Sequence, residues 1–72
     1  MNNLNMAKIQ LNGDTYEINK GTNLSELLNK LKIQKNKVAI EVNGKIIERN
    51  KYPDQILNSD DRVEIVHFIG GG

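Results

Sequence analysis

The chain has 72 residues, of which 38% are hydrophobic, and a formal net charge of +1. A chain of this length forms one domain and buries only about 60% of the surface of its unfolded form, so its core is small. Acidic and basic residues are interspersed, without the basic face that nucleic-acid binding needs or a polybasic membrane-binding cluster. The sequence has no cysteine, which excludes disulfides, cysteine-based metal sites and a thiol nucleophile.

The N-terminal residues 1–5 are mostly polar and lack the apolar region of a signal peptide. We expect them to form a flexible extension before a folded domain at residues 6–68. No apolar run approaches transmembrane length. Together with the absence of cysteine, this fits the reducing cytoplasm, where we expect the protein to reside.

Two strands are expected at the start of the domain. Residues 8–11 alternate polar and apolar side chains, and the alternation resumes over residues 15–18. Asn12-Gly13 lies between them, and this dipeptide is the strongest short signal for a tight hairpin turn. The sequence therefore predicts an antiparallel β-hairpin.

A short amphipathic helix is predicted next. Asn23 is a favourable N-cap, and Glu26 three residues later completes the pattern of a capping box. Apolar residues then recur at the spacing of one helix face: Leu24, Leu27, Leu28 and Leu31. A helix this short is unstable alone, so we expect it to cover a sheet.

The second half of the chain predicts three more strands. Residues 38–42 alternate, and the second Asn-Gly pair, at 43–44, turns the chain into a strand at 45–48. Residues 50–59 are expected to be irregular because Pro53 interrupts strand pairing. Residues 62–68 form the last and most apolar strand.

These elements predict a two-layer α+β domain in which one main helix covers one mixed sheet. The last strand is expected in the centre, beside the first. Ile56 and Leu57 are expected to anchor the irregular segment to the core. The remaining core residues are predicted from the matching helix and strand faces: Ile9, Leu11, Ile18, Leu24, Leu27, Leu28, Leu31, Val38, Ile40, Val42, Val63 and Ile65.

The chain ends in Gly70-Gly71-Gly72, directly after the last strand. A carboxylate on a glycine tail can enter a narrow slot, and without Cβ atoms its carbonyl is open to attack once activated. We expect residues 69–72 to form a flexible tail with Gly72 as the reactive end. The ordinary alternative is a frayed terminus without a function.

The last strand also provides a candidate binding patch. Val66 and Phe68 alternate with Val63 and Ile65, so they point to the opposite face of the sheet. With Ile69, they are expected to contact partner proteins. The alternative is that the irregular segment folds over them through Tyr52 or Ile56.

Other polar residues predict no catalytic or metal site. His67 is the single histidine, so a structural or partner-contact role is favoured over catalysis. Asp60 and Asp61 are adjacent, and we expect them to form a turn that opens the last strand.

In this order, several stretches resemble the ThiS family, the bacterial sulfur carriers of thiamine biosynthesis with the ubiquitin-like β-grasp fold. One departure is Asp60, where the family usually has glycine; aspartate tolerates the left-handed backbone better than most residues. The resemblance covers about residues 8–72 and is carried by residues 9–13, 24–28, 38–44, 61–66 and 70–72.

The resemblance implies a carrier rather than an enzyme. The Gly72 carboxylate would be adenylated by a partner that resembles ubiquitin-activating enzymes and uses ATP, so the chain would bind no cofactor itself. A sulfur donor protein would then displace AMP to leave a C-terminal thiocarboxylate, whose sulfur thiazole synthase would take. The competing hypotheses are the analogous carrier for molybdopterin, a modifier that attaches Gly72 to lysines, and a passive binding domain.

Overall fold

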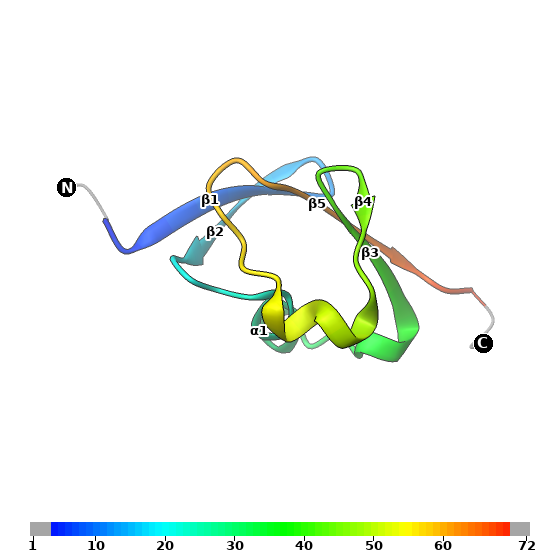
Figure 1. Ribbon diagram of the computed structural model, residues 1–72. Helices are drawn as coiled ribbons and strands as arrows, with labels where there is room; N and C mark the ends of the chain where they lie inside the picture. Colours follow the sequence, from blue (N-terminus) through cyan, green and yellow to red (C-terminus); the bar gives the residue numbers. More distant parts are fainter. Residues whose placement is uncertain (1–3, 70–72) are drawn as a thin grey trace.

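The computed structural model describes residues 4–69. They form a five-stranded mixed sheet in the order β2-β1-β5-β3-β4, with the helices on one face (Figure 1). The predicted two-layer α+β architecture is confirmed, and β5 is central beside β1. The elements are β1 (Met6–Leu11), β2 (Asp14–Asn19), α1 (Leu24–Leu31), η1 (Lys35–Lys37), β3 (Val38–Val42), β4 (Lys45–Ile46), η2 (Arg49–Asp54) and β5 (Arg62–His67), where η denotes a 3-10 helix.

Both predicted hairpin turns are present. Asn12 and Gly13 have φ angles of 49° and 87°, and Asn43 and Gly44 have 53° and 84°. Positive φ at both central positions defines the type I′ turn, whose twist matches that of the flanking strands. Because each turn has two residues, it fixes the register of its hairpin and therefore which side chains face the core.

The predicted cap of α1 is confirmed. The Asn23 side chain accepts a hydrogen bond from the Glu26 N–H at 2.8 Å, and the Glu26 carboxylate accepts one from the Asn23 N–H at 2.9 Å. Lys32 ends the helix in the left-handed conformation with φ 59°. The Lys30 ammonium lies 5.3 Å from the centre of the Tyr16 ring, linking α1 to β2. The start of this helix is thus set by local sequence.

The segment expected to be irregular contains η2, which packs beside α1 (Figure 1). The Leu24 N–H donates to the Gln55 C=O at 3.0 Å, and the Leu57 N–H donates to the Thr22 C=O at 2.8 Å. Leu57 is buried, as predicted, but Ile56 is 45% exposed, so its predicted role as a core anchor is wrong. Neighbouring side chains in this extended stretch point in opposite directions, and only one of the pair faces the core.

Two strands are shorter than expected. β4 ends at Ile46 rather than residue 48, although the Ile47 N–H still donates to the Ile40 C=O at 2.9 Å. The chain then leaves the sheet to begin η2 at Arg49. β5 ends one residue early, at His67.

The core lies between the sheet and the helical layer. Leu11 and Leu31 are half-buried rather than buried, because they lie at the ends of β1 and α1. Ala7 and Tyr52 are buried core residues that the sequence pattern did not predict. Within residues 4–69, no helix is both long and apolar enough to cross a bilayer. The buried side chains are Ala7, Ile9, Ile18, Leu24, Leu27, Leu28, Val38, Ile40, Val42, Tyr52, Leu57, Val63 and Ile65.

Candidate functional site

The two faces of β5 have opposite environments. Val63 and Ile65 face the helical layer and are 0% and 7% exposed, whereas Val66 and Phe68 are 59% and 48% exposed. The segment that includes η2 lies against the other face of the sheet, and Tyr52 is buried there. The alternative that this segment covers Val66 and Phe68 is therefore wrong. Their contact with partners stays a prediction.

Strand register adds an apolar residue that sequence reasoning missed. Glu41 on β3 pairs with Glu64 on β5 and with Ile46 on β4, so these three side chains share the uncovered face. Ile46 is 71% exposed. The two-residue Asn-Gly turn could have revealed it: that turn pairs Glu41 with Ile46, and Glu41 alternates with inward-facing neighbours.

Charged groups flank these apolar side chains. Glu41 and Glu64 are direct cross-strand neighbours, an arrangement in which like charges are destabilising. With Gly44, Arg62 and Val66 they line a shallow hollow of ≈ 400 Å³. We call the surface formed by Glu41, Ile46, Glu64, Val66 and Phe68 the outer patch. It combines exposed apolar side chains with two neighbouring carboxylates.

The outer patch lies at the base of the predicted tail. β5 runs parallel to β1 and carries the chain past the end of β1 (Figure 1). The Phe68 N–H donates to the Lys37 C=O at 2.9 Å, and Ile69 is 99% exposed. The predicted tail residues Gly70, Gly71 and Gly72 lie outside the described residues. Phe68, at one end of the outer patch, is therefore the direct neighbour of Ile69, where the described part of the chain ends.

The adjacent aspartates form a turn, as predicted. Asp60 adopts the left-handed conformation with φ 72°, which confirms that aspartate can replace glycine there. The Asp61 carboxylate accepts hydrogen bonds from the Asn43 side chain at 2.9 Å and the Asn58 N–H at 2.8 Å. Asp61 thus holds the start of β5 rather than a ligand.

His67 is the last residue of β5 and lies at the exposed end of the sheet. It lies opposite Val38 in the sheet but is exposed, so the helical layer does not cover this end of β5. In the part of the chain that the structure describes, no group of three or more His, Cys, Asp or Glu side chains could hold a metal ion.

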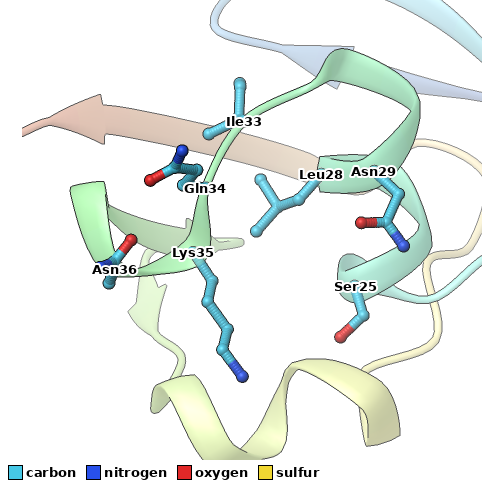
Figure 2. Close-up of a pocket in the computed structure, with 7 residues that line it drawn as sticks. All are labelled: Ser25, Leu28, Asn29, Ile33, Gln34, Lys35 and Asn36. Atoms are coloured by element: carbon cyan, nitrogen blue, oxygen red, sulfur yellow. The ribbon is translucent and has the colours of Figure 1, made fainter.

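A second hollow, of ≈ 570 Å³, lies on the helical layer (Figure 2). Leu28 and Ile33 form its apolar part, and the Lys35 side chain extends across its opening toward η2. Its polar lining consists of a hydroxyl, amides and an ammonium, without a carboxylate or an imidazole. It therefore lacks a general base and a metal ligand of those types, and it lies in the layer opposite the outer patch.

The model of the ThiS family matches residues 9–72, which include the C-terminal glycines. The chain belongs to the ThiS family. The crystal structure of the thiamine biosynthesis protein ThiS from Geobacter metallireducens superposes with a TM-score of 0.79 at 32% identity, covering 90% of this chain and 99% of that one. This likeness confirms the expected β-grasp fold.

Two relatives place the family in context. The sulfur carrier protein ThiS of Bacillus subtilis is 37% identical over 65 residues, which are 89% of this chain and 98% of that protein. A thiazole synthase of Magnetococcus marinus is 45% identical over 65 residues, which are 90% of this chain. The chain spans only 20% of the length of that synthase. A ThiS-like domain therefore occurs both alone and within longer proteins.

Proposed function

We propose that this chain is a sulfur carrier of thiamine biosynthesis and that the Gly72 carboxylate carries the sulfur. The observation that carries the proposal is the family match, which runs through Gly72. The exposed outer patch at the base of the tail supports it. The charge balance, the lack of cysteine and the absence of a metal-binding cluster within residues 4–69 leave the terminal carboxylate as the most suitable reactive group.

The proposed chemistry begins with activation, because a carboxylate is a poor acyl donor. A carboxylate oxygen of Gly72 attacks the α-phosphate of ATP, pyrophosphate leaves, and an acyl-adenylate forms. Hydrosulfide supplied by a donor protein then attacks the carbonyl carbon, so that a C–S bond forms, the C–O bond to AMP breaks, and loss of the thiol proton leaves a thiocarboxylate. The resulting thiocarboxylate is a soft nucleophile that thiazole synthase receives. ATP binds to the activating partner, so the chain acts as a carrier and co-substrate.

Two enzymes must therefore recognise the same small domain in turn, and we place this exchange in the cytoplasm. The adenylating partner would resemble ubiquitin-activating enzymes, and the second partner would be thiazole synthase. The occurrence of a similar domain within thiazole synthases supports the second pairing. We expect both partners to offer an apolar pocket to Val66 and Phe68, and a basic side chain to Glu41 and Glu64.

Intact-mass measurement tests this function. The full chain is incubated with ATP, an adenylating enzyme of the family and a sulfur donor, and its mass is compared with that of the untreated chain. We expect the gain that corresponds to replacement of one oxygen by sulfur, and no gain in the variant that lacks Gly72. Thiazole formation by thiazole synthase from the product distinguishes this carrier from one for molybdopterin. Lysine adducts of high mass would instead show a protein modifier.

A further inference from the structure

The two Asn-Gly turns each hold β5 through an asparagine side chain. Asn43 accepts a hydrogen bond from the Arg62 N–H at 2.8 Å and donates to the Asp61 carboxylate at 2.9 Å, at the start of the strand. Asn12 holds the strand farther along: it accepts from the Ile65 N–H at 2.7 Å and donates to the Ile65 C=O at 3.2 Å. The same turn chemistry therefore supports two different points of one strand.

The Asn12 contact replaces part of a missing strand. β1 pairs with β5 through Leu11 and Val63, and the Asn12 N–H donates to the Val63 C=O at 2.9 Å. The backbone then turns away toward β2. The Asn12 carboxamide supplies an acceptor and a donor, as the backbone of a strand residue would, and binds the N–H and C=O of Ile65 on the β1 edge of β5. The parallel ladder is thus extended to Ile65 by a side chain.

This contact lies close to the point where β5 leaves the domain. On the β3 side, the Phe68 N–H donates to the Lys37 C=O at 2.9 Å. The Asn12 contact is partly buried and holds the opposite edge at Ile65. β3 pairs with β5 as far as His67 and holds one edge of the strand, and the Asn12 side chain adds a contact on the opposite edge at Ile65. Loss of the Asn12 contact would remove the hydrogen bonds at Ile65 on the β1 edge and leave β3 to constrain the direction of the strand there.

We propose that Asn12 is a positioning residue, whose side chain fixes the direction in which β5 delivers the chain end to the adenylating enzyme. This inference rests on the proposed function. Asn12 acts through Ile65 and lies outside the outer patch, so it should affect delivery of the carboxylate rather than docking of the domain. A misplacement of about 1 Å can cost 10²-fold in a positioned reaction, so a small change in strand direction suffices.

The two turns provide a matched pair of variants, Asn12→Gly and Asn43→Gly. Glycine accepts the positive φ of both positions, so each turn can persist while the side-chain hydrogen bonds are lost. Both variants of the full chain are assayed for ATP–pyrophosphate exchange with the adenylating enzyme, well below their melting temperatures. Amide hydrogen exchange at Ile65 and Arg62 reports which end of β5 has loosened.

We expect Asn12→Gly to accelerate amide hydrogen exchange at Ile65. It should also lower the kcat of ATP–pyrophosphate exchange at least about 10-fold, since delivery of the carboxylate is impaired. Its KM for the carrier should stay within about twofold, because docking contacts are unchanged. Asn43→Gly should accelerate amide hydrogen exchange at Arg62 and leave kcat and KM near those of the unaltered chain. Asn12→Asp, which keeps the acceptor for the Ile65 N–H, should show an intermediate kcat.

Equal kcat values for the two glycine variants would overturn the inference. An increase in the KM of Asn12→Gly without a decrease in its kcat would also overturn it, because that result would indicate direct contact between Asn12 and the enzyme. If Asn12→Gly does not fold, Asn12→Asp decides: a kcat equal to that of the unaltered chain overturns the inference. Failure of the unaltered chain to support ATP–pyrophosphate exchange would instead contradict the proposed function.

Discussion

The inner and outer faces of β5 contrast in what they contribute. On the inner face, Val63 and Ile65 are almost fully buried and help to form a small core. On the outer face, Val66 and Phe68 are about as apolar but remain 59% and 48% exposed. Exposed apolar side chains gain little for folding, and when clustered they mark interaction sites. One strand therefore serves stability with one face and, in our proposal, recognition with the other.

The sharpest way to break this contrast is to truncate adjacent residues on opposite faces. Ile65→Ala removes buried methyl groups and leaves a cavity, so it should destabilise the domain by about 2–5 kcal/mol. Val66→Ala changes an exposed side chain and should alter stability by no more than about 0.5 kcal/mol. Chemical denaturation measures both. Similar losses from the two variants would show that the faces are not distinct.

The second prediction concerns binding through the outer patch. Phe68→Ala should weaken binding to the adenylating enzyme by about 1–2 kcal/mol or more, as truncation of an aromatic anchor does. Its melting temperature should change little, since Phe68 is 48% exposed. Ile56→Ala is the matched control, because Ile56 is 45% exposed in the segment packed on the opposite layer. Calorimetric titration that finds the same affinity for both variants would remove Phe68 from the interface.

The third prediction uses charge pairs on the outer face of the sheet. Glu64 on β5 lies directly opposite Glu41 on the neighbouring strand β3, whereas Glu17 on β2 lies opposite Lys8 on β1. Cross-strand charge pairs contribute about 0.2–1 kcal/mol with a sign set by the charges. Glu64→Gln should therefore slightly raise the melting temperature at neutral pH, and Glu17→Gln should slightly lower it. We also expect Glu64→Gln to slow association with partners, and high salt should reduce that difference. A lower melting temperature in Glu64→Gln would contradict this account.

The smallest effect is expected from the buried tyrosine of η2. Burial raises the pKa of Tyr52 above its ordinary value of 10.0, and the nearby Arg49 partly opposes this shift. A raised pKa in the folded state means that the neutral phenol is stabilised by folding; its contribution is complete below the unfolded pKa and is lost as pH rises through the folded pKa. Tyr52→Phe should therefore lose less stability above about pH 10 than the unaltered chain. If the melting temperatures of the two proteins fell by the same amount as the pH rises above about 10, this prediction would be wrong.

Local sequence signals predicted most of the fold. The two Asn-Gly turns, the capping box at Asn23 and the leucine stripe each depend on residues close together in the chain, and the structure confirms them. The burial of Tyr52 and the exposure of Ile56 depend on how η2 packs against α1, which no periodic pattern encodes. The burial of these two residues therefore depends on tertiary packing, which local sequence patterns do not predict.

In the candidate site, too, local patterns placed some residues and tertiary contacts placed others. Alternation along β5 was enough to place Val66 and Phe68 on the uncovered face. Ile46 joins them only through the register of β4 against β3. The Asn12 contact with Ile65 joins residues 53 positions apart, so it could not be read from the turn dipeptide alone. The sequence pattern could not reveal this contact between distant residues, whereas the local Asn43-Gly44 turn held the information that places Ile46.

ATP–pyrophosphate exchange with the Gly72 deletion tests the central claim most directly. The deletion shortens the chain end by about 3.5 Å, well beyond the misplacement of about 1 Å that can cost 10²-fold in a positioned reaction. The account predicts an unchanged melting temperature, because the buried core residues lie between Ala7 and Ile65, and a loss of exchange of at least about 100-fold. A variant with one glycine added after Gly72 should lose exchange to a similar degree. Exchange at the normal rate by the deletion variant, together with normal thiazole formation, would contradict the assignment of Gly72 as the sulfur-carrying residue.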